Sequence, residues 1–293
     1  MSGAGAELDR LELDAVGLAD ALLAGASPSV FRGDGMEPAG LRPYVPGDDV
    51  RSLDWRVTAR AGKPHVRERI EERAVELRIV LDRSASLLKR GHASAARAAR
   101  DTAATLAAAG CRQTRPTALL QFSESVGGEV EPGSGRGHLR RLLSAIHAPF
   151  PPGHGTGMAR ACDRLAGTLR FRTLLMVISD FLLPAEEWMR AASALARMAR
   201  AHDVVLLRVR TRGPGALPSV GRVRIRDPES GEVRVVDPGP AARRLLEGAE
   251  EEREARWRGL VRAPGVTPVE LAPDGNLVTQ LAAGLAMRHR RGA

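Results

Sequence analysis

The chain has 293 residues, of which 43% are apolar and 27% charged, and its formal net charge is +9. This balance is typical of a globular protein and argues against a disordered chain. No stretch offers the roughly 18 consecutive apolar residues of a membrane-spanning helix, and the N-terminal residues lack the charged start and apolar core of a signal peptide. We therefore expect a cytoplasmic protein without a membrane span.

The positive charge is spread along the chain. Arginines recur singly and have few aromatic neighbours, whereas nucleic-acid sites gather cations and stacking rings. We expect no nucleic-acid partner, and an acidic protein partner fits the net charge equally well. Cys111 and Cys162 are too few for a disulfide framework or a zinc site and are interpreted as plain buried thiols.

The first 74 residues are predicted to form an N-terminal helix and an arm or small subdomain. Apolar residues recur at helical intervals over residues 5–24, and Gly25 follows them. Residues 27–73 are irregular, with Gly, Pro and Asp at short intervals and apolar pieces such as HVRERI that are short enough for strands.

Residues 75–293 are predicted to form a second, regular domain in which apolar strands alternate with helices. The strands are expected at 75–82, 117–124, 173–180, 203–210 and 266–273, and the helices near 92–109, 136–146, 157–168, 185–200, 240–260 and 275–289. This alternation is typical of a parallel sheet covered on both faces, so we predict a doubly wound, mostly parallel α/β fold of the Rossmann type. Two alternating segments within residues 221–237 add a β-hairpin at the edge of the sheet.

Oxygen-bearing side chains follow several of these strands. Asp82, Ser84 and Ser86 come directly after the first strand, Asp180 ends a later one, and Thr156 precedes a helix. In an open α/β sheet the carboxyl ends of the strands meet in one crevice, where ligands bind. Hydroxyl and carboxylate oxygens suit a hard cation such as Mg²⁺, so the sequence predicts a metal site at this edge.

The segment DRSAS resembles the Asp-x-Ser-x-Ser loop of the metal-ion-dependent adhesion site in von Willebrand factor A domains, and Thr156 and Asp180 match its two later loops. The resemblance implies that Ser84 and Ser86 coordinate Mg²⁺ or Mn²⁺ directly and that Thr156 does so directly or through water. It also implies that Asp82 and Asp180 hold coordinated waters. A Glu or Asp of a protein partner takes the remaining position, so the implied function is metal-dependent binding without catalysis.

The arm carries a second resemblance. Residues 40–73, GLRPYVPGDDVRSLDWRVTARAGKPHVRERIEER, resemble the hallmark segment of the bacterial domain-of-unknown-function family fifty-eight. The family's members carry an A-type domain directly after it and are often associated with MoxR-type AAA+ ATPases, which implies such an ATPase or its client as partner. The matching residues are Arg42, Tyr44, Gly47, Asp48, Asp49, Arg51, Asp54, Trp55, Ala59 and Arg60.

Simpler structural roles fit the same residues. Ser86 and Thr156 are good helix caps, and Asp180 is a common turn residue. In the arm, the aspartates and arginines have the spacing of an internal scaffold with Trp55 plugging a core, and a docking surface for a partner is the alternative. The sequence leaves both interpretations of the arm open.

An enzyme is the runner-up hypothesis. The chain contains neither a phosphate-binding Gly-x-x-x-x-Gly-Lys loop nor a Gly-x-Ser-x-Gly elbow, and Ser84 stands where a haloacid-dehalogenase-type phosphatase needs a second aspartate. His154, close to Thr156, is the one residue with the chemistry of an acid or base at the crevice. We expect no enzymatic activity and keep a metal-assisted phosphoesterase as the alternative.

Overall fold

The computed structural model describes residues 2–25, 41–46, 53–67, 75–88, 93–150, 156–211, 223–226, 233–236 and 239–291. Its centre is a six-stranded sheet with the order β10-β7-β6-β3-β4-β5. The strands are β3 (Leu77–Asp82), β4 (Thr117–Phe122), β5 (Val126–Gly133), β6 (Leu174–Ser179), β7 (Asp203–Val209) and β10 (Val266–Leu271). Every neighbouring pair is parallel except β4 and β5, which confirms the predicted mostly parallel α/β fold.

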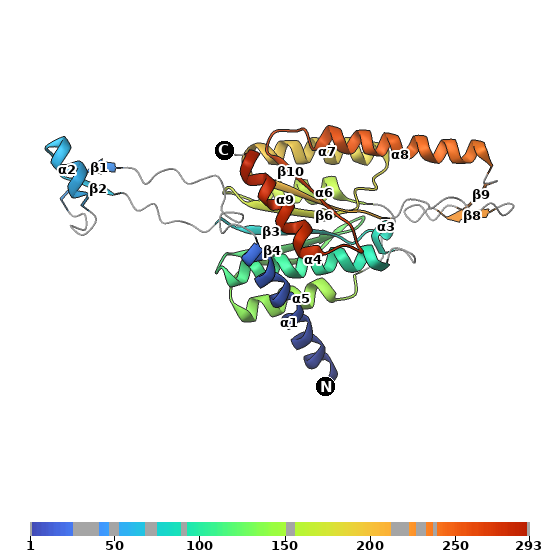
Figure 1. Ribbon diagram of the computed structural model, residues 1–293, viewed down its shortest axis with the longest axis horizontal. Helices are drawn as coiled ribbons and strands as arrows, with labels where there is room; N and C mark the ends of the chain where they lie inside the picture. The colour runs from blue at the N-terminus through green and yellow to red at the C-terminus, as the bar shows by residue number, and fades with distance from the viewer. Residues whose placement is uncertain are drawn as a thin grey trace.

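Helices cover both faces of this sheet because successive strand residues point to opposite sides. In β6, Met176 packs into the core on one face and Val177 into the core on the other. Figure 1 shows α4 and α5 on one side of the sheet and α7 and α8 on the other. The first core includes residues of α1 (Ser2–Gly25), α4 (Ala93–Arg112), α5 (Arg136–His147) and α9 (Leu277–Arg291); the second includes residues of α6 (Met158–Thr168), α7 (Ala185–Ala201) and α8 (Pro240–Leu260).

The N-terminal helix packs on the α/β body. Its buried residues Ala15, Ala19 and Leu22 belong to the first core, and Glu12 accepts hydrogen bonds from Arg136 (2.6 Å) and Arg140 (2.8 Å) of α5. The predicted domain boundary at residue 74 stays a prediction, but α1 shares the core of the body that follows that boundary.

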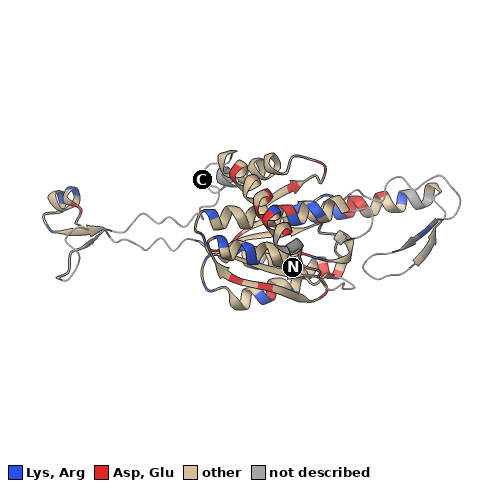
Figure 2. Cartoon of the chain, turned by 90° about the horizontal axis from the view of Figure 1, so that it is seen from below, with Lys and Arg blue, Asp and Glu red and all other residues tan. Residues whose placement is uncertain are grey.

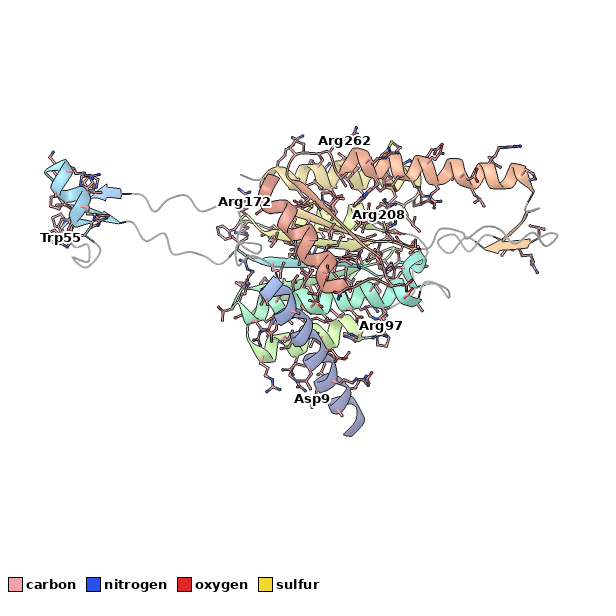
Figure 3. The ribbon with its side chains drawn as sticks, in the orientation of Figure 1. Asp9, Trp55, Arg97, Arg172, Arg208 and Arg262 are labelled. Atoms are coloured by element: carbon pink, nitrogen blue, oxygen red, sulfur yellow. The ribbon has the colours of Figure 1, made fainter. Side chains whose placement is uncertain are left out.

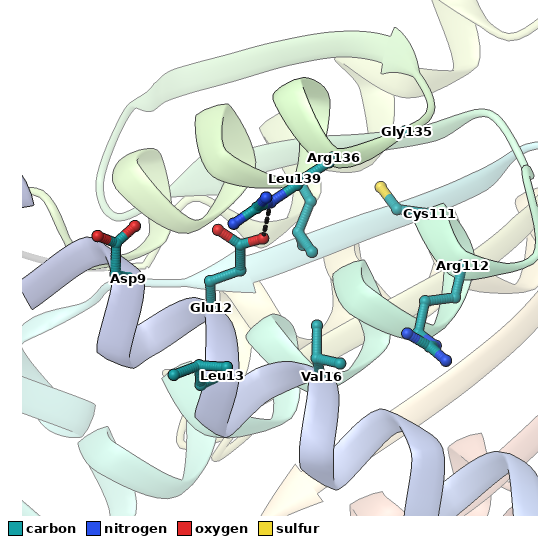
Figure 4. A pocket seen from close by; sticks show the side chains of 9 residues that line it. All are labelled: Asp9, Glu12, Leu13, Val16, Cys111, Arg112, Gly135, Arg136 and Leu139. Carbon is teal, nitrogen blue, oxygen red and sulfur yellow. Dashed lines mark hydrogen bonds and ion pairs between the residues drawn. The ribbon is translucent and has the colours of Figure 1, made fainter. Parts of the chain in front are cut away.

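A cavity of about 610 Å³ lies between α1, α4 and α5 (Figure 4). Its charged lining residues already have partners: Glu12 pairs with Arg136, Asp9 with Arg140, and Arg112 with Asp20. The rest of the lining is largely apolar. Every charged side chain that lines the cavity is therefore already paired, and an incoming charged group would have to displace one of these pairs.

Two smaller strand pairs accompany the main sheet. The predicted hairpin is present as β8 (Val223–Arg226) and β9 (Val233–Val236), and among the described residues its ladder is separate from the six-stranded sheet. Strand β5 was not predicted. Its sequence VGGEVEPG is rich in glycine and acidic residues, and it pairs irregularly at the sheet's edge, where an apolar pattern is not required.

The described part of the arm is a small unit of its own. Strands β1 (Leu41–Pro43) and β2 (His65–Arg67) pair antiparallel, and α2 (Trp55–Ala61) lies between them in the sequence. Asp54 caps α2 by accepting hydrogen bonds from the backbone N–H groups of Arg56 and Val57, and Gly62 ends the helix with a φ of 66°. Both ends of this seven-residue helix are thus fixed by local sequence.

Candidate functional site

The strand order reverses between β3 and β6, and the candidate site lies at the carboxyl end of these two strands. From β3 the chain proceeds to β4 and β5 on one side, and from β6 it proceeds to β7 and β10 on the other. Leu81 of β3 lies opposite Ile178 of β6, so Asp82 and Ser179 end the two strands side by side. Such a reversal leaves a crevice between the loops, which is where open α/β sheets bind ligands.

Asp82 is fully buried at this point. One carboxylate oxygen accepts a hydrogen bond from the backbone N–H of Ser84 (2.8 Å), and the other accepts one from the hydroxyl of Ser179 (2.6 Å). Burial, and secondarily the nearby charge of Asp180, raises the pKa of Asp82 to about 7. A carboxylate in such a place favours a neighbouring positive charge, which lowers the cost of keeping it ionised.

Ser84 and Ser86 face each other, with their hydroxyl oxygens 3.2 Å apart. Both side chains are buried: Ser84 lies in the turn after β3, and Ser86 lies in the short helix α3 (Ala85–Leu88). Arg83, which lies between Asp82 and Ser84 in the sequence, directs its guanidinium to Gln121 and to the carbonyls of Ile146 and Ala148. Arg83 thereby anchors the loop to β4 and α5, and the hydroxyls of Ser84 and Ser86 remain within contact of each other.

Thr156 supplies the third hydroxyl. It is 8% exposed, and its Oγ1 is buried without a hydrogen-bond partner among the described residues. Thr156 does not cap α6: the capping position is Gly157, and the carboxylate of Glu187 accepts the N–H of Ala159 in the first turn (2.9 Å). A buried hydroxyl left without a partner loses hydrogen-bond energy, so this oxygen is suited to a ligand.

The backbone after Thr156 is pressed against the turn between β4 and β5. Gly157 donates its N–H to the carbonyl of Ser123 (2.5 Å), and a Cβ at this position would lie 2.5 Å from the carbonyl oxygen of Glu124. Only glycine allows so close an approach without displacement. Gly157 therefore fixes where Thr156 lies relative to β4, the neighbour of β3.

Asp180 is 3% exposed and follows the last residue of β6. One of its carboxylate oxygens accepts the backbone N–H of Leu182 (3.0 Å), so the residue takes part in a turn, as the simpler interpretation expects. Its charge also acts on Asp82, which places the two carboxylates near each other. The turn role of Asp180 is therefore compatible with a role in the site.

The donor set fits a hard cation. Hydroxyls of Ser84, Ser86 and Thr156 and two nearby carboxylates are oxygen ligands of the kind Mg²⁺ and Mn²⁺ accept. Across the described ranges, no three His, Cys, Asp or Glu side chains cluster to hold a metal ion. A cation at this edge would therefore depend on the hydroxyl oxygens.

The arm residues are only partly described. Asp54 is the cap of α2, the backbone N–H of Tyr44 bonds the carbonyl of Pro64 (2.8 Å), and Arg60 is exposed on α2. Trp55 is 68% exposed (Figure 3), so the hypothesis that it plugs a core is wrong. It begins a short capped helix whose residues are all at least partly exposed, which leaves its indole in solvent.

Several predicted residues lie outside what can be described. Gly47, Asp48, Asp49, Arg51 and His154 are outside the described residues, and the side chain of Arg42 in β1 is not described either.

Sequence reasoning missed four residues that shape the site. Ser179 bonds Asp82, Arg83 anchors the serine loop, Gly157 positions Thr156, and Glu187 caps α6. Ser179 and Arg83 are adjacent to predicted ligands, which is a usable signal. The partners of Gly157 and Glu187 are distant in sequence, and no local pattern shows them.

The surface of the described residues mixes charges of both signs. Basic and acidic residues follow one another along α8 (Figure 2), where Arg253 pairs with Glu250 and Arg256 with Glu252. These pairs lie at helical spacing on a solvated face. None of the helices in the described ranges is long and apolar enough to cross a membrane.

Curated relatives cover almost the whole chain. An uncharacterized protein of Mycobacterium tuberculosis strain H37Rv is 35% identical over 304 residues, which span 98% of this chain and 90% of the relative. Among solved structures, the chain is similar to BatB from Bacteroides thetaiotaomicron, with a TM-score of 0.40 and 15% identity over 73% of this chain and 98% of the other. An aerotolerance-related membrane protein from Bacteroides fragilis matches with a TM-score of 0.45 and 15% identity over 71% of this chain and 96% of the other.

The model of one protein family matches residues 40–256, which include the described arm, β3 to β9 and most of α8. This range contains both the hallmark segment and all five residues of the candidate site. The chain belongs to the family described as "Protein of unknown function DUF58".

Proposed function

We propose that the protein is a non-catalytic interaction module that binds a divalent cation, Mg²⁺ or Mn²⁺, at the carboxyl edge of its sheet and through it a carboxylate of a protein partner. The observation that carries the proposal is the hydroxyl of Thr156, which is buried yet has no hydrogen-bond partner in the described part of the chain. A buried hydroxyl in that state gains from a ligand, and a cation can provide one.

In this proposal some residues of the site are direct ligands of the cation and others position those ligands. The hydroxyls of Ser84, Ser86 and Thr156 would hold the ion as neutral ligands, and Asp82 and Asp180 would bring negative charge to the same edge. A bound Mg²⁺ or Mn²⁺ supplies a positive centre to which an incoming carboxylate is attracted. Ser179 and the N–H of Ser84 hold the carboxylate of Asp82 in one orientation, which positions its charge at the edge.

The partner proposed is a MoxR-type AAA+ ATPase or a client delivered to it. The support is the resemblance of residues 40–73 to a hallmark segment whose carriers are often associated with such ATPases. A partner carboxylate that completes the ion's shell makes the association dependent on the cation.

Thr156→Val tests the metal-dependent mode. Valine has nearly the same shape and removes one hydroxyl, so the affinity for Mg²⁺ measured by isothermal titration should fall about tenfold. Co-purification with a co-expressed MoxR-type ATPase should weaken in the variant, and EDTA should weaken it in the unmodified protein.

Thr105→Val is the matched control. Thr105 is a fully buried threonine of α4 whose hydroxyl bonds the carbonyl of Asp101, away from the carboxyl edge. Its loss should leave Mg²⁺ binding unchanged. Equal Mg²⁺ affinity in the Thr156 and Thr105 variants would contradict the role given to Thr156.

The exposed tryptophan of the arm favours a second contact surface. Trp55 lies next to Arg56 on α2, and Arg60 and Lys63 close by are exposed as well. An exposed indole among cations is typical of an interface anchor for an acidic surface with an apolar pocket. We propose that the arm contributes to binding the same protein partner.

Trp55→Ala should therefore leave the melting temperature unchanged while weakening the association with the partner about tenfold, as loss of an interface anchor does. Thermal denaturation and co-purification measure the two effects. A clear drop in melting temperature together with unchanged association would assign Trp55 a structural role instead.

The alternative, a metal-assisted phosphoesterase, predicts turnover of simple phosphomonoesters or phosphodiesters in the presence of Mg²⁺. We propose that no turnover occurs, because no activated nucleophile is identified among the residues of the edge. Turnover that disappears in His154→Ala would reverse this ranking.

A further inference from the structure

The residue after Asp180 has a strained backbone. Phe181 has a φ of 54°, in the left-handed region that bulky side chains rarely adopt. Such a conformation is unfavourable and persists only where surrounding contacts enforce it. Two hydrogen bonds belong to this turn: the N–H of Phe181 donates to the Ser179 hydroxyl (2.9 Å) and the N–H of Leu182 to the Asp180 carboxylate (3.0 Å).

The same hydroxyl of Ser179 that accepts the N–H of Phe181 also donates to the carboxylate of Asp82. The strained turn is therefore connected to both carboxylates of the candidate site. If Phe181 returned to an ordinary negative φ, the rotation about its N–Cα bond would move the Phe181 ring and the N–H of Leu182 relative to Asp180. The hydrogen bond that Leu182 donates to the Asp180 carboxylate would then be lost.

The contact that holds Phe181 in place comes from α8. Its ring is 5% exposed and lies 4.9 Å, between centroids, from the indole of Trp257, at an interplanar angle of 47°. Trp257 is 3% exposed and is part of the core formed by α6, α7 and α8. Tilted aromatic pairs at this distance are favourable beyond the area they bury.

Arg208 holds the indole in turn. Its guanidinium carbon lies 5.1 Å from the centre of the Trp257 ring, and its side chain pairs with Glu254 of α8 (2.8 Å). Arg208 lies opposite Ser179 in the register between β6 and β7. The contacts therefore form a continuous path from Ser179 and Asp180 through Phe181 to Trp257, fixed at its far end by a partly buried ion pair.

We infer that Trp257 is a positioning residue for the candidate cation site: its tilted ring contact with Phe181 enforces the strained turn that orients Asp180 and, through Ser179, Asp82. The inference rests on the proposed function. It assigns a role in ion binding to Trp257 of α8, which offers the ion no ligand atom. Trp257 lies outside the Asp-x-Ser-x-Ser motif and away from the strand ends in the sequence.

Trp257→Leu removes the ring but keeps an apolar side chain of moderate size. Its affinity for Mg²⁺, measured by isothermal titration, should fall about tenfold, as expected for loss of an outer-shell contact. In the metal-free protein, hydrogen exchange at the amides of Phe181 and Leu182 should accelerate about tenfold, because both depend on the turn. Trp257→Phe, which keeps a ring, should restore affinity and exchange to within about threefold of the unmodified protein.

Trp188→Leu is the matched control, because Trp188 of α7 packs against the same core and has no ring contact with Phe181 among the described residues. It should change neither Mg²⁺ affinity nor exchange at the turn. If Trp257→Leu does not fold, Phe181→Leu removes the same ring contact from the other side and carries the same expectations.

The outcomes separate the two claims. If the unmodified protein binds Mg²⁺ and a folded Trp257→Leu or Phe181→Leu variant binds it equally well, the positioning role is overturned and the proposed function stands. If the unmodified protein binds no Mg²⁺, the proposed function fails and the inference fails with it. Weaker binding together with faster exchange at Phe181 and Leu182, absent from Trp188→Leu, supports the inference.

Discussion

Asp82→Asn should lower the affinity for Mg²⁺ about 100-fold, the upper end of the range for groups that orient metal-bound ligands. The substitution keeps the shape of the side chain and removes one of the two negative charges at the edge. Isothermal titration of Mg²⁺ and Mn²⁺ into the purified variant measures the effect. Of the candidate residues, Asp82 has the largest expected effect because it is fully buried and contacts both the serine loop and Ser179.

Thermal denaturation in EDTA provides the fold control for this variant. Burial raises the pKa of Asp82 to about 7, so near and above that pH the folded protein bears the cost of a buried charge. Asparagine carries no charge, and the variant should melt no lower than the unmodified protein at pH 8. Undiminished Mg²⁺ binding by a folded Asp82→Asn variant would end the assignment of this edge as the metal site.

Gly157→Ala should destabilise the protein by about 1–3 kcal/mol, the usual cost of forcing extra atoms into a packed site. The added Cβ would lie 2.5 Å from the carbonyl oxygen of Glu124 and 3.0 Å from that of Ser123. Both are backbone atoms, so relief requires the loop to move. Because Thr156 is the preceding residue, the same movement should also weaken Mg²⁺ binding. Chemical denaturation and isothermal titration check the two effects.

Gly167→Ala is its control, in α6, the helix that Gly157 precedes. Nothing lies within 4 Å of a Cβ added at Gly167, and alanine favours helix by up to about 1 kcal/mol relative to glycine. This variant should be as stable as the unmodified protein or more so, with unchanged Mg²⁺ affinity. A Gly157→Ala variant as stable as Gly167→Ala would show that the close approach to Glu124 does not constrain the loop.

The regular elements of the fold were predictable because their patterns are local. The central strands are mostly apolar and buried along their whole length, and the helices between them carry apolar residues at helical spacing. Strand β5 escaped prediction because an edge strand without buried residues needs neither apolar residues nor strong strand formers, and its sequence contains three glycines and a proline.

The candidate site was predictable to the extent that its residues follow strand ends. Asp82, Ser84 and Asp180 were selected by position, and the parallel register of β3 and β6 brings their backbone together. The contacts that orient them were not predictable, because Phe181 and Trp257 are 76 positions apart by their residue numbers and meet only through packing. One of the two interpretations of the arm placed Trp55 in a core on residue type alone, whereas Trp55 lies exposed on a short helix with no buried residue.

The measurement that tests the central claim most directly is the location of Mn²⁺ by anomalous scattering in crystals of the full chain grown with MnCl₂. The account predicts one strong peak at the carboxyl edge of the sheet, within coordination distance of the hydroxyl oxygens of Ser84 and Ser86 and near Thr156. The peak should be absent from crystals of Asp82→Asn grown under the same conditions. No peak at this edge in the unmodified protein, or a peak bound only by side chains elsewhere, would contradict the account.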